Sequence, residues 1–243
     1  SEGAVGTDVS AQSAIDETGR YIAFESQATN LSDAATTLNR NHIYRKDTVT
    51  GEVLLVSSDD AGLEANNDSY SPRISDDGRY VVFESLATNL SSISTGGARQ
   101  VFIKDLADTD QTDGEVNIEL VSRDATGLVA ASTTAANPDV SNDGRYIVFE
   151  SAATILSALP ANGISQIYLK DMLDDSVDMI SQNTTQTAGG NGDSNRPSMS
   201  PGGQYIVFDS VAGSSIESGR SPTRSVYIYD STAATPVELV SVD

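Results

Sequence analysis

Carboxylate and carboxamide side chains are the groups in this sequence with the widest capacity for chemistry. The chain of 243 residues contains 35 aspartates and glutamates, and two of its loops repeat the order Asn-x-Asp-Ser. Such oxygens are the ligands that calcium takes. The predicted calcium ligands are Asp68, Asp193, Asn66 and Asn191. The alternative is that these residues only shape turns, because the other two loops carry Val9 and Thr134 where the aspartates stand.

Groups for nucleophilic or acid–base catalysis are scarce. The absence of cysteine excludes thiolate nucleophiles, thiolate metal sites and disulfides. The single histidine, His42, occupies a slot that holds glutamine or serine in the other repeats, so we predict a hydrogen-bonding surface residue. Two carboxylates alone can hydrolyse glycosides. We predict no catalytic residues and no enzymatic activity, with a carboxylate-dependent glycosidase or lyase at an axial cleft as the alternative.

The charge balance excludes several classes of partner. Fourteen basic residues against 35 acidic ones give a formal net charge of −21. Phosphate backbones and anionic lipid surfaces repel such a chain, so we predict no nucleic-acid partner. The apolar runs are four or five residues long, far below the roughly 20 that span a bilayer, so we predict no membrane insertion. No leader-like segment precedes the first repeat, which favours a mature form or an excised domain.

Four copies of one unit position these residues. Each copy contains a Tyr-x-x-Phe-acid-Ser segment, and the four segments are Tyr21–Ser26, Tyr80–Ser85, Tyr146–Ser151 and Tyr205–Ser210. A short strand before a Gly turn precedes each segment, and two further short apolar blocks follow it. Each unit is therefore predicted to be four antiparallel strands. The predicted units are residues 1–57, 58–122, 123–181 and 182–243.

The Tyr-x-x-Phe segments are apolar on both faces. A strand of that kind is buried on both sides, which favours radially stacked blades over a two-sheet sandwich, whose strands alternate. We therefore predict an all-β fold, a β-propeller of four four-stranded antiparallel blades within a single domain, 1–243. Two alternatives stay open: the four blades close on themselves, or they belong to a larger propeller.

The few basic residues recur at fixed positions. An arginine follows the turn glycine in three units, opposite the aspartate that ends the third strand. The predicted cross-strand ion pairs are Arg20–Asp47, Arg79–Asp105 and Arg145–Asp171. The fourth unit has Gln204 in place of the arginine, which favours a different neighbour for that blade.

A family resemblance follows from these residues. The run Asn66-x-Asp-Ser-x-x-Pro72-x-Ile-Ser-x-Asp-Gly-Arg-Tyr80-Val-Val-Phe, followed by Ile103-Lys-Asp-Leu106, resembles the TolB-like β-propeller repeat of bacterial envelope and secreted proteins. Such repeats serve as binding scaffolds, assembly modules and accessory domains of enzymes, so the resemblance indicates a fold more sharply than a function.

The resemblance and the acidic surface together yield the functional prediction. We expect a non-catalytic extracellular binding or scaffold module, secreted, on the cell surface or in the periplasm of a bacterium. A protein partner or self-association is expected. The alternatives are the glycosidase or lyase given above and a calcium or small-ligand site at the propeller axis. No cofactor other than calcium is predicted.

Overall fold

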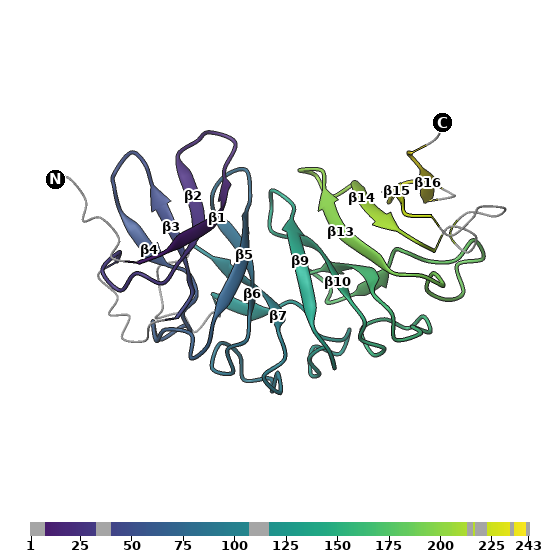
Figure 1. Ribbon diagram of the computed structural model, residues 1–243, viewed down its shortest axis with the longest axis horizontal. Helices are drawn as coiled ribbons and strands as arrows, with labels where there is room; N and C mark the ends of the chain where they lie inside the picture. Colours follow the sequence, from purple (N-terminus) through teal and green to yellow (C-terminus); the bar gives the residue numbers. More distant parts are fainter. Residues whose placement is uncertain are drawn as a thin grey trace. The chain divides into compact units, whose positions relative to one another are not determined.

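The computed structural model describes residues 8–32, 40–106, 117–212, 216, 223–233 and 236–241. Its strands form four separate four-stranded sheets (Figure 1). The first sheet contains β1 (Ser10–Ile15), β2 (Tyr21–Ser26), β3 (His42–Asp47) and β4 (Val53–Leu55). The second contains β5 (Ser69–Ile74), β6 (Tyr80–Ser85), β7 (Gln100–Asp105) and β8 (Ile118–Leu120). The third contains β9 (Ala135–Val140), β10 (Tyr146–Ser151), β11 (Gln166–Asp171) and β12 (Val177–Met179). The fourth contains β13 (Ser194–Met199), β14 (Tyr205–Ser210), β15 (Ser225–Asp230) and β16 (Val237–Leu239).

Each sheet is an antiparallel meander whose strands pair in chain order, as the repeat predicts. We call the sheets blades 1 to 4. Each lies inside one of the predicted units. The chain divides into two compact units, residues 1–120 with blades 1 and 2, and residues 121–243 with blades 3 and 4. The prediction of a single domain stays a prediction.

One aromatic pair lies at the centre of every blade. The Phe of the second strand stands directly opposite an aromatic residue of the third strand. The pairs are Phe24–Tyr44, Phe83–Phe102, Phe149–Tyr168 and Phe208–Tyr227, with ring centroids 5.8 to 6.0 Å apart and planes inclined by 22 to 25°. Offset pairs of this kind contribute about 0.5–1.5 kcal/mol beyond the area that they bury. Most of the aromatic residues are therefore part of the framework.

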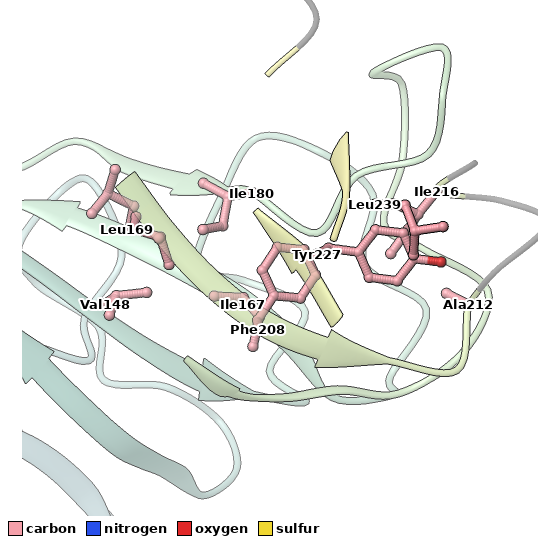
Figure 2. Close-up of a cluster of buried hydrophobic side chains, with 10 residues drawn as sticks. Val148, Ile167, Leu169, Ile180, Phe208, Ala212, Ile216, Tyr227 and Leu239 are labelled. Carbon is pink, nitrogen blue, oxygen red and sulfur yellow. The ribbon is translucent and has the colours of Figure 1, made fainter. Parts of the chain in front are cut away.

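The second strands are buried on both faces in the middle blades. Val81, Val82 and Phe83 follow one another along β6, so their side chains alternate between the two faces, yet all three are fully buried. In residues 121–243, β13 of blade 4 covers Val148 of blade 3. One apolar cluster runs through both of these blades (Figure 2). Within residues 1–120 and within residues 121–243, the two sheets therefore stack face on face as propeller blades do.

A turn glycine of one blade lies against a tyrosine of the preceding blade. A Cβ atom on Gly78 of blade 2 would lie 2.2 Å from Cδ2 of Tyr21 in blade 1. A Cβ atom on Gly203 of blade 4 would lie 2.7 Å from Cδ2 of Tyr146 in blade 3. The carbonyl of Gly78 also accepts a 2.7 Å hydrogen bond from Nη1 of Arg45. Only glycine leaves room for the ring at these turns.

The first strand of every blade contains a β-bulge. The bulge residues are Gln12, Ser71, Asn137 and Arg196, with φ between 35 and 54°. The pairing with the second strand shifts register at this point in each blade. An unpaired N–H at a bulge needs another acceptor, which explains one of the polar contacts described below.

No helix within the described residues is both long and apolar enough to cross a membrane.

The close contact at Gly78 yields a stability prediction. We expect Gly78→Ala to lower the free energy of unfolding by about 3 kcal/mol, because about 1 kcal/mol of strain at positive φ adds to a clash with the Tyr21 ring. Gly62→Ala is the matched control, since its φ of 77° is nearly the 73° of Gly78 and no atom lies within 4 Å of its Cβ position. Urea unfolding of both variants measures the difference. Equal losses in the two variants would show that the blade contact adds nothing.

Candidate functional site

The three predicted arginine–aspartate pairs are all present. The shortest nitrogen–oxygen distances are 2.7 Å for Arg20–Asp47, 2.6 Å for Arg79–Asp105 and 2.6 Å for Arg145–Asp171. Each arginine donates through both Nε and Nη2. The hydrogen bonds from Arg20 hold the pKa of Asp47 below its ordinary value, and those from Arg145 do the same for Asp171.

The same arginines also cover the tyrosines that open the second strands. The guanidinium carbons of Arg20, Arg79 and Arg145 lie 4.7 to 4.8 Å from the ring centroids of the tyrosines that follow them. Each cation is therefore shared between a carboxylate and an aromatic face. In blade 4, Gln204 replaces the arginine, and its amide lies 3.3 Å from Oδ1 of Asp230. These contacts are structural, as the regular spacing predicts.

The only histidine belongs to a serine–histidine–glutamate arrangement. Nδ1 of His42 lies 3.2 Å from Oγ of Ser57, and Nε2 lies 3.3 Å from Oε2 of Glu64. The prediction of a surface residue is wrong, because His42 is only 1% exposed. The loop that carries Glu64 lies over the start of β3, and the alignment of the repeats did not indicate this cover. Burial lowers the pKa of His42, against the opposing effect of the Glu64 carboxylate.

The repeat shows that this arrangement is structural. Oγ of Ser57 accepts a hydrogen bond from the N–H of Ile43. In blade 3, Ser181 accepts the same bond from Ile167 and donates to Oε1 of Gln166, which takes the place of the histidine. A nucleophile must be within reach of a substrate, and Ser57 is fully buried. The serine therefore caps the third strand, and His42 is one of its interchangeable partners.

In blades 1 and 3, the acidic residue after the Phe of the second strand joins the blade to the next one. Oε1 of Glu25 in blade 1 accepts a 2.6 Å hydrogen bond from the bulge N–H of Ser71 in blade 2. Oε2 of Glu150 in blade 3 accepts the corresponding 2.6 Å bond from Arg196 in blade 4. The Phe-acid-Ser order at the end of every second strand is the sequence signal for this contact, and the sequence alone does not reveal its acceptor role. The bulge N–H thus finds its acceptor in the preceding blade.

The predicted calcium ligands of blade 2 shape loops around the start of β5. The carboxylate of Asp68 accepts hydrogen bonds from the N–H of Asn41 at 2.9 Å and from the hydroxyl of Tyr70 at 3.1 Å. Asn66 exchanges two 2.9 Å bonds with Thr88 through its side chain. All these contacts lie within residues 1–120.

The corresponding residues of blade 4 lie in residues 121–243. Oδ1 of Asp193 accepts a 3.1 Å bond from the N–H of Ser165, as Asp68 does from Asn41. Asn191 is exposed. In the part of the chain that the structure describes, no three His, Asp or Glu side chains are grouped to hold a metal ion. The contacts support the turn-shaping alternative, and the calcium site stays a prediction.

A small pocket lies between blades 3 and 4. Its volume is about 180 Å³, and Tyr146, Leu169 and Gln204 are among its lining residues. The other lining residues are glycines and hydroxyl side chains, so this pocket brings no carboxylates together. General acid–base hydrolysis of a glycoside needs two such groups. The pocket therefore offers no support for the glycosidase alternative.

Among the described residues, one face of blade 4 exposes side chains that are buried in the equivalent blade 3. Tyr205, Val207 and Val226 on this face are 43%, 38% and 41% exposed. The residues equivalent to the two valines in blade 3, Val148 and Ile167, are fully buried. We call the three residues the blade 4 face. Its composition is that of a blade-to-blade contact, yet it has no cover in the described residues.

Blade 1 exposes a different surface, the one that the preceding blade covers in blade 2. Ile15 on β1 is 61% exposed, whereas its equivalent Ile74 on β5 is 9% exposed. Gly19, in the turn after β1, has a φ of 73° and only its own blade's Ile15 near its Cβ position, at 3.9 Å. Gly78, the equivalent glycine, lies under a tyrosine ring. We call Ile15, Gly19 and the bulge residue Gln12 the blade 1 edge.

Solved structures with this fold include propellers of different function. The chain is 18% identical to TolB from Acinetobacter baumannii, with a TM-score of 0.53 over 96% of this chain and 43% of that one. It is 12% identical to the β-propeller domain of the Trilobed protease from Pyrococcus furiosus, which has an open velcro topology, with a TM-score of 0.53 over 99% and 59% of the two chains. A prolyl endopeptidase matches at 13% identity and a TM-score of 0.52, over 96% of this chain and 29% of that one.

At these identities the likeness establishes the fold, which is that of TolB-like β-propellers. The chain spans less than two thirds of the length of each of these three structures. No protein-family model matches the sequence, and no curated protein matches it.

The buried histidine yields a pH prediction. Because the folded-state pKa of His42 lies below its ordinary value of 6.5, the unfolded chain binds the proton more readily. Stability is therefore present above about pH 6.5 and is lost as pH falls through that value. We expect the melting temperature to fall less between pH 7.5 and 5.5 in His42→Gln, which copies the residue of blades 2 and 3, than in the unmodified chain. Identical slopes would contradict the assignment.

The calcium prediction has a direct test. If the four predicted residues bind calcium, addition of about 1 mM CaCl₂ raises the melting temperature, and chelation reverses the rise. Asp193→Asn keeps the Oδ1 acceptor for Ser165 but removes the charge, so it is expected to abolish the rise without disturbing the loop. Asp174→Asn, in an exposed hairpin, is the control. A calcium effect that survives Asp193→Asn, or no effect on the unmodified chain, would exclude the site.

Proposed function

We propose that this chain is a non-catalytic protein-binding module of a bacterial surface, secreted or periplasmic protein. The observation that carries the proposal is the exposure of the blade 4 face, whose valine equivalents in blade 3 are fully buried. Exposed side chains that elsewhere form a packed contact are typical of a surface that a protein partner covers.

The chemistry of the blade 4 face favours a protein as the ligand. A tyrosine ring with two β-branched residues presents apolar area and one hydroxyl group. Tyrosine is enriched at protein interfaces for this reason. Phosphate-bearing ligands are disfavoured by the net charge of −21. Within the chain, the equivalent face of blade 3 is packed against another blade.

The polar groups support a non-catalytic role. The arginines that the repeat singles out are paired with aspartates, and the serine–histidine–glutamate arrangement is buried. The second-strand glutamates of blades 1 and 3 bind backbone N–H groups of the next blade. These groups stabilise the sheets, which leaves them committed to the fold rather than to a substrate.

The cellular location is part of the proposal. The acidic surface suits an extracellular or periplasmic protein. The fold of this chain is that of TolB-like propellers. Its sequence resembles the repeat of bacterial envelope and secreted proteins, which favours the same compartments.

Photo-crosslinking in the producing bacterium tests the proposal. A benzophenone amino acid at position 226, on the blade 4 face, is expected to form a specific adduct with one protein, identified by mass spectrometry. The same group at position 49 is the control, because Val49 is 76% exposed in the turn between β3 and β4. The adduct is expected to be lost when Tyr205→Asp is added. No adduct at position 226, or equal adducts at both positions, would overturn the proposal.

A further inference from the structure

We propose that copies of this chain associate head to tail, with the blade 4 face of one copy packed on the blade 1 edge of a second copy. The inference rests on the proposed function and names the partner. The chain contains both halves of one contact, and each half is exposed in the described residues.

The contact is defined by the two blade pairs that show it complete. In blades 1 and 2, the ring of Tyr21 lies under Gly78 and the carboxylate of Glu25 accepts the bulge N–H of Ser71. A backbone bond of 3.2 Å from Glu17 to Asp76 joins the two turns. Blades 3 and 4 repeat all three features, with the turn-to-turn bond at 2.8 Å between Asn142 and Pro201. The preceding blade therefore supplies a ring and a carboxylate, and the following blade supplies a glycine turn and a bulge.

Blade 4 carries the half that a preceding blade supplies. Tyr205 is the equivalent of Tyr146, and its ring is 43% exposed. Asp209 is the equivalent of Glu150. Its Oδ2 pairs with Arg196 at 2.7 Å, and its Oδ1 lies 3.1 Å from Nη1 of Arg224. That Oδ1 accepts no hydrogen bond from the described residues, although it is buried. The ring is thus exposed to a following blade, and the carboxylate beside it is held by two arginines.

Blade 1 carries the half that a following blade supplies. Gly19 has the left-handed φ of 73° and only Ile15 of its own blade near its Cβ position, where Gly78 meets a tyrosine ring. Gln12 has the bulge conformation, with a φ of 35°. Ile15 is 61% exposed where the equivalent Ile74 is 9% exposed. This edge offers the same ring-sized space and the same kind of bulge that blades 2 and 4 present to their neighbours.

A second copy is favoured as the occupant because it brings both surfaces. The blade 4 face and the blade 1 edge are complementary halves of a contact that the chain already makes twice. A contact between two different surfaces is heterologous, so it generates a closed ring or an open filament rather than a two-fold dimer. The charge of −21 on every copy opposes association. Screening by salt is therefore expected to strengthen it.

Sedimentation analysis of the purified chain gives the first test. We expect oligomers of the 25.5 kDa chain to increase between about 1 and about 100 μM, and more so at about 0.5 M than at about 0.1 M salt. Val226→Asp blocks the blade 4 face, and Gly19→Ala places a methyl group where the incoming ring lies. Each variant is expected to be monomeric.

Two controls separate the interface from general effects. Val49→Asp adds the same charge at a position that is 76% exposed. Gly51→Ala imposes the same strain, because its φ is 79° and nothing lies within 4 Å of its Cβ position. Both controls are expected to associate as the unmodified chain does. Association that Val226→Asp and Gly19→Ala leave intact would overturn the proposal.

A mixing experiment tests the head-to-tail arrangement itself. Val226→Asp retains an intact blade 1 edge, and Gly19→Ala retains an intact blade 4 face. An equimolar mixture is expected to form a dimer of about 51 kDa, twice the 25.5 kDa chain, and nothing larger. Failure of the mixture to associate, or a monomeric unmodified chain at every concentration, would overturn the inference. A monomeric chain that still forms a single adduct with another protein at position 226 would leave the proposed function standing.

Discussion

Blades 1 and 3 of this protein each depend on the following blade to cover a second apolar face. A single four-stranded sheet cannot cover both faces of its own second strand. The Tyr-x-x-Phe strands are apolar on both faces, so the second face needs cover from outside the sheet. In the described residues, the first strand of the following blade supplies the cover, with a glycine turn under a tyrosine and a bulge N–H on a glutamate. Stability therefore lies in the contacts between blades as much as in the hairpins.

This constraint accounts for the use of the rare side chains. Arg20, for example, is held between Asp47 and the ring of Tyr21, which the next blade covers. The single histidine fills a slot that glutamine fills elsewhere. Among the described residues, the distinctive surface is therefore an uncovered face of blade 4. Function is then expected to come from what covers that face.

The repeat allowed most of the fold to be predicted, because four copies fix the strand register and the register fixes the Arg20–Asp47 type of pair. The burial of His42 was not predictable, since it depends on a loop whose path the repeat does not encode. The hydrogen bond that Glu25 accepts from the next blade required a bulge that no residue type marks. Gln204 led to the prediction of a different neighbour for blade 4, which stays a prediction, and it did not indicate that the valines of this blade are exposed.

Hydrogen exchange measured by mass spectrometry tests the dependence on neighbours most directly. At a concentration where the chain is monomeric, amides of β10 and β11 in blade 3 are predicted to exchange more slowly than the equivalent amides of β14 and β15 in blade 4. The ladders are the same in both blades, whereas Val148 is fully buried and Val207 is 38% exposed. Equal protection of the two strand pairs would contradict the account, because each blade would then be stable without its neighbour.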